Sequence, residues 1–427
     1  MIGGVVAAGG GRATGTRRPE RLNIKAGVWP LVIITVSLSA IGVLALDWAI
    51  CFANDFRGFR QPIGDFAAFY AVGEMLNQNP PQNIYDFQAH TAAMRRVSAN
   101  FPDRPTLPYT HAPFEALMLR AIARLPYRWA YLTWIGLSIG LFVVGYWMLS
   151  PLLPHMNREQ RVLGMLLLLS WPPLLLYSLV NGQVCAVYFF SVACALRLVH
   201  DGCPMLAGMV LSLSTYKPTL LLLVIPMLLL MRQWRVVAGL LVGGIVLASI
   251  SVATVGIDGC LAWIGAVRRL AANEHLQLQK YVDIGSFGRL LVGSESGLAT
   301  ALAYGITLAG AVVLFGVWSR RPRTDVAWSL ALVWGIVLSP YGPVYEGVTV
   351  AIGALLLVNF TYEREGRIPN TLKVLLTVLY LVPWVTQEAA QRSGLQLMTL
   401  AVVAMGVWAL WSTGAASGRE TAKSQAG

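Results

Sequence analysis

The chain contains a succession of apolar stretches, most of them about 17 to 25 residues long and separated by polar or charged segments. At 1.5 Å of rise per residue, about 20 helical residues cross a hydrocarbon core about 30 Å thick. Hydrophobic residues make up 56% of the sequence and charged residues only 12%, unlike the composition of a soluble globular domain. These lengths predict an all-α integral membrane protein whose spans are helices.

Counting the apolar runs between charged breaks predicts about twelve membrane spans. The longest run begins at Pro204 and contains Lys217-Pro218, where a proline either kinks or divides a helix. The junction at Asn181-Gly182 carries no charge that would mark a turn. The expected spans lie near residues 28–50, 109–125, 129–152, 162–180, 182–200, 204–231, 235–256, 298–318, 325–339, 342–359, 371–387 and 395–412.

Basic residues set the expected orientation, because the cytoplasmic flanks of membrane helices are rich in Lys and Arg. The segment before the first span holds Arg12, Arg17, Arg18, Arg21 and Lys25, so we expect the N-terminus in the cytoplasm. Alternate crossings then place the later basic clusters on that same side: Arg124/Arg128, Arg232/Arg235, Arg320/Arg321/Arg323, Arg364/Arg367/Lys373 and Arg419/Lys423.

This threading divides the chain into three segments. They are a disordered cytoplasmic N-terminus over 1–27, a polytopic membrane domain over 28–412 and a disordered cytoplasmic tail over 413–427. Two long polar loops, 52–108 and 257–297, fall on the outer side, where we expect amphipathic helices and the chemistry of the protein. No small-residue cleavage pattern follows the first apolar run, so we expect that run to remain as an anchor.

Charge and cysteine content argue against two other classes of protein. The net charge of +12 comes from basic residues at the ends of apolar runs, which suits anionic lipid headgroups and gives no sign of nucleic acid binding. The five cysteines lack the spacing of zinc ligands and are odd in number, so we expect buried thiols and no disulfide framework. Oligomeric state stays open, because apolar spans pack equally well against lipid, a second copy or a partner.

Asp65 stands in Gly64-Asp65-Phe66, where the first polar loop meets apolar residues at helical spacing that continue to Leu76. This spacing predicts an amphipathic helix lying on the membrane, which ends at Asn77 and the following prolines. Asp65 would then be its N-cap, a position that aspartate favours. Capping and catalysis on a lipid substrate are both open and compatible interpretations of this carboxylate.

Lys217 lies inside an apolar run, where a lysine costs roughly 2.5–3.5 kcal/mol on insertion scales. It therefore needs an anionic partner such as a phosphate, a wet cavity, or a path by which its head reaches the surface. His111 either hydrogen-bonds at a helix end or binds a phosphate at the outer surface. Tyr85 and Tyr109 suit the aromatic belt of a membrane interface with or without a further role.

The second long loop carries Arg268, Arg269, Tyr281 and Asp283, and we expect much of it to be a solvated amphipathic face. A later segment, Ser339-Pro340-Tyr341 through Tyr345-Glu346, reads as a tight outer turn between two spans. This turn either presents its tyrosines and glutamate at the membrane edge or serves only as a connection.

The order of these short motifs resembles glycosyltransferase family 87, bacterial membrane enzymes of the GT-C class that include polyprenyl-phosphate-mannose-dependent α-mannosyltransferases. The similarity covers about residues 30–360. Two positions depart from the family pattern: Ala112-Pro113 replaces the usual Pro-Pro, and Glu346 stands where aspartate is common. The matching elements are Gly64-Asp65-Phe66 with Tyr70, Asn83-Ile84-Tyr85-Asp86, Tyr109 to Pro126, Asn181-Gly182-Gln183, Tyr216-Lys217-Pro218, and Ser339-Pro340-Tyr341 through Tyr345-Glu346.

The resemblance implies a GT-C-type helical bundle in a bacterial inner (plasma) membrane, with its active site facing the periplasm. It implies transfer of a hexose, with mannose expected, from a polyprenyl-phosphate sugar to an envelope glycolipid or glycan, with inversion and with Asp65 as general base. Cations would hold the donor phosphate, and polar and aromatic groups would bind the substrates. The expected phosphate-binding residues are Lys217, His111, Arg268 and Arg269, and the expected substrate-binding residues are Tyr70, Tyr85, Tyr109, Gln183, Tyr341, Tyr345 and Glu346.

We expect no cofactor beyond the donor and no metal ion, since the first loop has no second acidic ligand beside Asp65. The main rival interpretation is a transporter or flippase in which Lys217, in a broken helix, binds an anion or a lipid-linked sugar. No inverted repeat is visible in the sequence. A noncatalytic scaffold for envelope assembly is the second rival, and it predicts that replacing Asp65 has no effect.

Overall fold

The computed structural model describes residues 31–32, 34–43, 45, 64–78, 83–97, 109–271, 277–293 and 297–425, and its regular elements are almost all helices. The expected disordered segment 1–27 and its basic cluster lie outside these residues. The tail after residue 412, also expected to be disordered, continues the last helix. Within the described residues, the only strand-like feature is one isolated antiparallel bridge between Tyr281 and Pro343.

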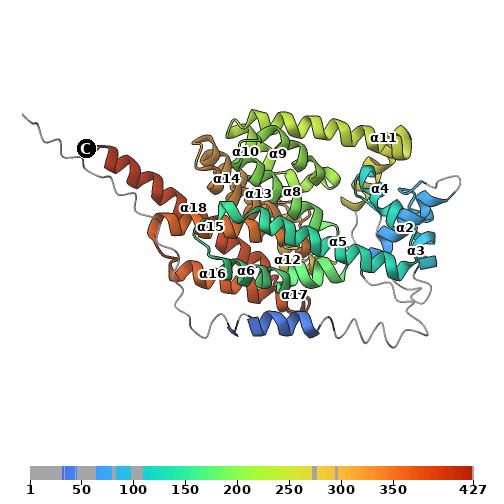
Figure 1. Ribbon diagram of the computed structural model, residues 1–427, viewed down its shortest axis with the longest axis horizontal. Helices are drawn as coiled ribbons and strands as arrows, with labels where there is room; N and C mark the ends of the chain where they lie inside the picture. Colours follow the sequence, from blue (N-terminus) through green and yellow to red (C-terminus); the bar gives the residue numbers. More distant parts are fainter. Residues whose placement is uncertain are drawn as a thin grey trace, which may run out of the picture.

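The helices succeed one another along the whole described chain (Figure 1). Several are interrupted by short 3-10 turns or, in one case, a π-helix, which divide the long apolar runs. The first described helix is Ile34–Val43. The labelled α-helices that follow are α2 Phe66–Asn77, α3 Phe87–Val97, α4 Pro113–Ile122, α5 Tyr127–Met148, α6 Arg158–Ser170, α7 Pro172–Leu174, α8 Cys185–His200, α9 Pro204–Leu211, α10 Val224–Leu230, α11 Trp234–Ala271, α12 Ile284–Val292, α13 Gly297–Ser319, α14 Thr324–Val337, α15 Val348–Glu365, α16 Asn370–Leu381, α17 Thr386–Ser393 and α18 Leu397–Gln425. The shorter turns used below are η3 Leu175–Val180, η4 Ser212–Tyr216, η5 Pro218–Leu221 and η7 Val344–Gly347.

Four helices in the described part of the chain are long and apolar enough to cross a membrane. Two bent pairs, Arg158–Ser170 with Pro172–Val180 and Thr386–Ser393 with Leu397–Thr413, raise the number to six if each pair is one span. Six further apolar helices are shorter, with 10–17 residues. The described residues therefore hold four to six membrane-length helices, and the twelve predicted spans, of which the first lies partly outside these residues, are not confirmed. The four long helices are Tyr127–Leu152, Trp234–Arg269, Thr300–Ser319 and Val344–Glu365.

The apolar run 204–231 is divided at Lys217-Pro218 into two short arms. A side chain on Gly239, near the start of α11, would come within 1.9 Å of the Met205 carbonyl oxygen, so the start of the run lies beside the residues that follow its end. The end of the run therefore lies at about the same depth in the membrane as its start. Proline causes the division, since it lacks an N–H and clashes with the preceding turn.

The second expected span, 109–125, holds only the ten-residue helix α4. This helix runs against α2 so closely that a side chain on Gly73 would meet the Leu119 carbonyl oxygen at 2.3 Å. The Tyr70 hydroxyl of α2 also donates to the Leu125 carbonyl at 3.0 Å. Arg124 therefore lies on the same side of the membrane as α2, which is part of the first long loop. The expectation that Arg124 and this loop lie on opposite sides is wrong.

Helix α2 begins at the predicted residue but does not lie on a surface. Nine of its residues are buried, distributed around the helix, and α3 and α4 pack against it. Figure 1 shows these three helices together at one end of the molecule, beyond the end of α5. The sequence showed apolar spacing but not the neighbouring helices that bury the remaining face, so the predicted amphipathic surface helix is a core helix.

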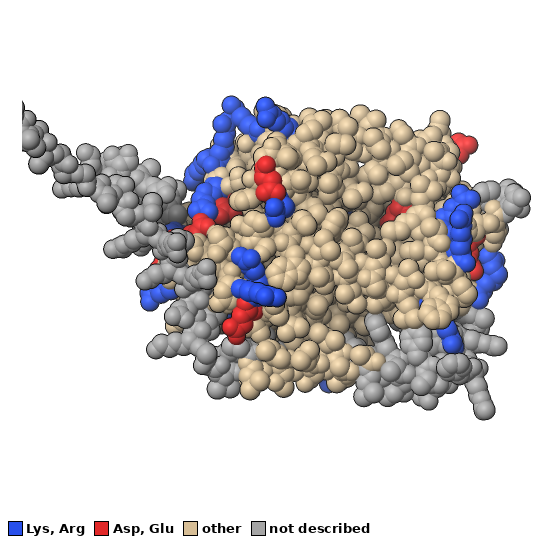
Figure 2. Space-filling model, viewed as in Figure 1, with Lys and Arg blue, Asp and Glu red and all other residues tan. Residues whose placement is uncertain are grey.

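Charged side chains gather at two opposite ends of the visible face, with few between them (Figure 2). Exposed apolar side chains of α11 and α13, such as Ile245 and Leu308, are each 67% exposed. An uncharged belt that exposes large apolar side chains is the surface that lipid tails solvate, since there is no water to satisfy polar groups there. The structure therefore agrees with an integral membrane protein.

Helices α9 and α11 touch through glycines, and this contact yields a test of the packing. A side chain on Gly208 would lie 1.9 Å from the Val236 carbonyl oxygen, so Gly208→Ala should lower the free energy of unfolding by roughly 1–3 kcal/mol. Gly140 in α5 is the control, because a methyl group there meets no atom within 4 Å and should leave stability equal or higher. Thermal unfolding of both variants in detergent measures this, and equal midpoints would contradict the packing.

Candidate functional site

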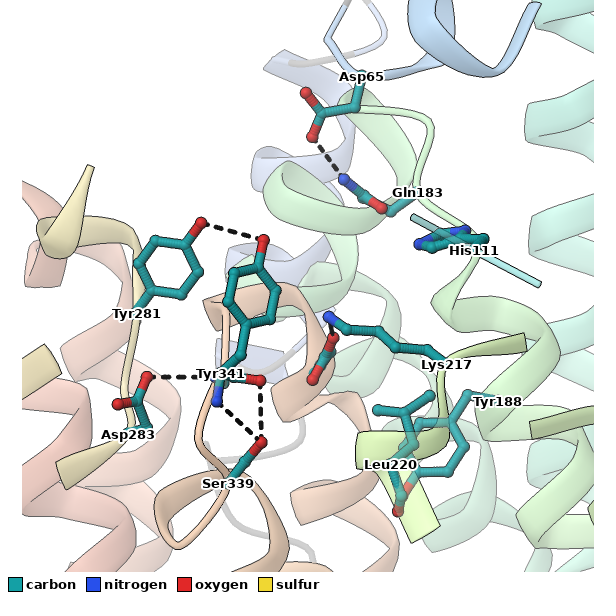
Figure 3. A network of polar contacts seen from close by, with 12 residues as sticks. Asp65, His111, Gln183, Tyr188, Lys217, Leu220, Tyr281, Asp283, Ser339 and Tyr341 are labelled. Atoms are coloured by element: carbon teal, nitrogen blue, oxygen red, sulfur yellow. Dashed lines mark hydrogen bonds and ion pairs between the residues drawn. The ribbon is translucent and has the colours of Figure 1, made fainter. Parts of the chain in front are cut away.

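Asp65 is fixed by a junction between the start of α2 and the turn Asn181–Gln183. The backbone N–H groups of Asp65 and Phe66 both donate to the Asn181 carbonyl, at 2.8 and 3.0 Å. The Gln183 side-chain nitrogen donates to Asp65 Oδ2 (Figure 3). Two motifs that are separated by more than a hundred residues in the sequence therefore form one unit, and the carboxylate has a defined orientation.

Glycines on both sides make this junction possible. Gly64 has φ +58°, and a side chain there would lie 2.4 Å from the Asn181 Cα. Gly182 has φ +69°, and its side chain would lie 2.5 Å from the Phe66 Cβ. Only glycine adopts such φ values without strain and also leaves room for the backbone opposite. The Trp134 indole N–H donates to the Gly182 carbonyl at 2.8 Å and supports the turn from α5.

Asp65 occupies the N-cap position of α2, but its side chain makes no capping hydrogen bond. Its carboxylate reaches to Gln183 in place of the first turn of its own helix. The capping interpretation of the side chain is therefore wrong, although the position in the chain is the one predicted.

Lys217 lies at the break between η4 and η5, and its ammonium group forms an ion pair with Glu346 in η7. Glu346 is buried, with 4% of its side chain exposed, and Lys217 is mostly covered, with 12% of its side chain exposed. The Lys217 Nζ also lies 4.3 Å from the centroid of the Tyr341 ring and 5.7 Å from that of Tyr345. The lysine that the sequence marked as needing an anion therefore has one inside the protein.

Tyr341 is held by the segment that contains Tyr281 and Asp283, which we expected to be a solvated face. The Tyr281 hydroxyl donates to the Tyr341 hydroxyl at 3.1 Å, and the Val282 N–H donates to the Gly342 carbonyl at 2.8 Å. Asp283 accepts from the Gly342 N–H at 3.2 Å and caps α12 by accepting from the Ser286 N–H at 2.7 Å. Tyr281 and Asp283 are buried, so the expectation of a solvated face is wrong at these positions.

The groups of this segment affect one another's ionisation. Burial raises the pKa of Tyr341, and the negative charge of Asp65 raises it further. Burial likewise raises the pKa of Tyr281, with smaller contributions from Tyr341 and Asp65. Burial also raises the pKa of Asp283, against the opposing effect of its hydrogen bonds to Ser286 and Gly342. Both tyrosines are neutral hydroxyl groups at neutral pH, suited to hydrogen bonding.

We use the term polar centre for Asp65, Gln183, Lys217, Glu346, Tyr341, Tyr345 and Tyr281. Figure 3 shows the side chains of Asp65, Gln183, Lys217, Tyr281 and Tyr341 converging from separate segments of the chain. The centre combines a fixed carboxylate, an amide, a buried ammonium group and phenolic hydroxyls. Such a set can accept a proton, bind an anion and hydrogen-bond a polyol.

His111 lies beside the polar centre and has its own acidic neighbour. Its Nδ1 is 2.7 Å from Glu115 Oε2, one turn along α4, and both side chains are buried. The Ala112 N–H donates to the Tyr216 carbonyl at 2.8 Å, so this segment contacts the residue directly before Lys217. The His111 ring also packs edge-on against Tyr216 with centroids 5.1 Å apart.

The other expected site residues lie outside the polar centre. The Tyr70 hydroxyl donates to Leu125, the Tyr85 hydroxyl donates to the His111 carbonyl at 2.8 Å, and Tyr109 stacks on Tyr85 with centroids 5.6 Å apart. These three tyrosines are buried, so they support the segments that carry Asp65 and His111.

The two expected arginines are placed differently from Lys217. Arg269 donates to the Tyr85 carbonyl at 3.3 Å, and both Arg268 and Arg269 are exposed near the end of α11. Among the residues that the structure describes, no three His, Cys, Asp or Glu side chains are grouped as metal ligands. Asp283 had a usable sequence signal, because Asp is a favoured N-cap directly before an apolar helical run.

The fold and the polar centre define a helical membrane protein with groups suited to proton transfer and anion binding. Residues 109–340, more than half of the 427-residue chain, match the model of glycosyltransferase family 87. The chain belongs to this family and is a membrane glycosyltransferase, which confirms the predicted resemblance at the level of the family. No curated protein and no solved structure matches the chain. Asp65, Tyr341 and Glu346 lie outside the matched residues.

The junction at Asp65 can be tested with two glycines of the same backbone conformation. Gly366 has φ +67° with no atom within 4 Å of an added side chain, so Gly366→Ala should cost only the strain of a left-handed residue, about 1–2 kcal/mol. Gly64→Ala has the same strain and also the contact with Asn181, so it should destabilise more and reduce sugar transfer. Thermal unfolding and a transfer assay on both variants check this, and equal effects would show that the junction is loose.

Proposed function

We propose that the protein transfers a hexose, with mannose as the expected sugar, from a polyprenyl-phosphate sugar to an envelope glycolipid or glycan. The observation that supports this most directly is the rigid placement of Asp65 beside the aromatic groups that surround Lys217. A carboxylate and a cation held in one centre are what a transferase needs in order to activate a hydroxyl and stabilise a leaving phosphate.

In the proposed reaction, an acceptor hydroxyl attacks the anomeric carbon of the donor while Asp65 takes the hydroxyl proton. The bond between the anomeric carbon and the phosphate oxygen breaks, and its electron pair stays on the phosphate. Attack from the face opposite the leaving group inverts the configuration. Because phosphate is stable as an anion, one carboxylate base is enough, whereas a glycosidase also needs an acid.

The donor phosphate would be held mainly by Lys217, with His111 as a nearby second group. A cation fixed in a low-dielectric site stabilises developing negative charge without reorganisation. Arg268 and Arg269 are exposed at the outer end of α11, where they suit capture of the anionic headgroup before it reaches the centre.

Sugar hydroxyls would be bound by Gln183, Tyr341 and Tyr345, whose polar groups belong to the polar centre. Tyr70, Tyr85 and Tyr109 contribute by supporting α2 and the segment of His111. We place the site on the periplasmic side of a bacterial inner membrane, because a basic N-terminal flank precedes the first span and the first long loop follows it.

Asp65→Asn should lower the rate of transfer about a hundred- to ten-thousand-fold, because a positioned base contributes that much. The side chain keeps its shape, so a loss of rate without a loss of folding isolates the charge. Transfer of radiolabelled mannose from polyprenyl-phosphate mannose to membrane lipids measures the effect. Asp258→Asn is the matched control, since it removes an exposed carboxylate of α11 and should retain wild-type activity.

The outcomes of this assay separate the candidate functions. Full activity of Asp65→Asn would mean that another group is the base. Movement of the lipid headgroup by the wild type without a new glycosidic bond would favour the transporter interpretation. Absence of mannose transfer by the wild type, together with transfer from another prenyl-linked sugar, would keep the reaction class and correct the sugar.

Transfer should not depend on a divalent metal ion, because Lys217 supplies a positive charge for the phosphate. We expect the purified protein to keep most of its activity after treatment with EDTA. The measurement is the mannose transfer rate before and after chelation. A loss that Mg²⁺ or Mn²⁺ restores would contradict this prediction and would assign the charge stabilisation to a metal ion.

A further inference from the structure

Glu346 has a role that the reaction scheme leaves unexplained. Glu346 forms an ion pair with Lys217, the same cation that the donor phosphate would bind. The Glu346 backbone is fixed, because its N–H donates to the Pro343 carbonyl at 2.9 Å and its carbonyl accepts from the Thr349 hydroxyl at 3.3 Å. Lys217 reaches from the end of a long flexible side chain, so the lysine is the group that can change its anion.

A buried ammonium group is costly without an anion, so Lys217 needs one at every stage of a catalytic cycle. The resting centre uses the Glu346 carboxylate, and the loaded centre would use phosphate. The ammonium group has three N–H donors, so it can contact both anions while it changes from one to the other. Exchange of partners therefore avoids an unpaired charge in the protein interior.

The charge of the lipid phosphate changes during the proposed reaction. The donor is a phosphodiester with one negative charge. When the bond to the anomeric carbon breaks, the phosphate becomes a monoester with a charge of about −1.5 to −2 at neutral pH. A lone lysine would hold this product more strongly than the substrate, and turnover would slow at product release.

We propose that Glu346 is an internal counter-ion that competes with the lipid phosphate for Lys217 and so promotes release of the polyprenyl phosphate product. This inference rests on the proposed role of Lys217 in binding the donor phosphate. Glu346 acts through the lysine as a positioning residue: its fixed carboxylate repels the more highly charged product and takes the ammonium group back.

The test compares the full-length wild type with Glu346→Gln, using farnesyl phosphate as a short analogue of the product. Removal of the competing charge should lower the inhibition constant of farnesyl phosphate about tenfold. The KM for the donor should also fall, and kcat should fall with a burst of product in the first turnover, because release becomes limiting. Asp258→Asn should match the wild type in each measurement.

Glu346→Asp is a second variant that tests the inference if Glu346→Gln does not fold. It keeps the charge but withdraws the carboxylate by one methylene group, so its inhibition constant should lie between those of the wild type and Glu346→Gln. An unchanged or higher inhibition constant in both variants would overturn the inference. A higher KM for the sugar donor with unchanged farnesyl phosphate inhibition would also overturn it, and would assign Glu346 to a sugar hydroxyl.

Direct binding keeps the inference and the proposed function separable. Thermal stabilisation by farnesyl phosphate, measured without any sugar, should be larger for Glu346→Gln than for the wild type. If this holds while no prenyl-linked sugar is transferred, the proposed function fails and the counter-ion role stands. If neither protein is stabilised by farnesyl phosphate, the phosphate subsite and the inference both fail, whatever the transfer assay shows.

Discussion

The site depends first on the contact between two tight turns, Gly64–Phe66 and Asn181–Gln183. One carbonyl, that of Asn181, accepts both N–H groups at the start of α2, and the glycines on either side leave no room for a side chain. This contact converts a carboxylate at the end of a loop into a group with a fixed position. Base catalysis needs such a position, because its rate falls steeply when the reacting atoms are misplaced.

The charged groups of the site are paired with other side chains of the protein. Asp65 accepts from Gln183, Lys217 pairs with Glu346, and His111 lies beside Glu115. In a low-dielectric interior this is required, since each uncompensated charge would cost several kcal/mol. A charged substrate that binds here must therefore replace a side chain of the protein as the ionic partner. The strength of the Lys217–Glu346 pair then sets how tightly an anionic ligand is held.

The sequence predicted the structure correctly where local residues determine the backbone conformation. Pro218 divides the long apolar run, Gly64-Asp65 marks the start of α2, and the order of the motifs identified the family. It failed where distant elements decide the outcome. The segment that became α4 and the core helix α2 have compositions that suit either lipid or protein surroundings, and the burial of Tyr281 follows only from its contact with the turn after Ser339.

The short helix α4, where we expected a full span, and the division of the run at Pro218 have a common physical basis. An interrupted helix in a membrane exposes backbone groups that must be satisfied by protein. Here the Tyr216 carbonyl accepts from the Ala112 N–H, and the Leu220 carbonyl accepts from the Tyr188 hydroxyl at 2.9 Å (Figure 3). The segment before α4 therefore stays at the break and satisfies it, and does not begin a crossing of its own. The same arrangement brings His111 beside Lys217, so the break, the short helix and the polar centre form together.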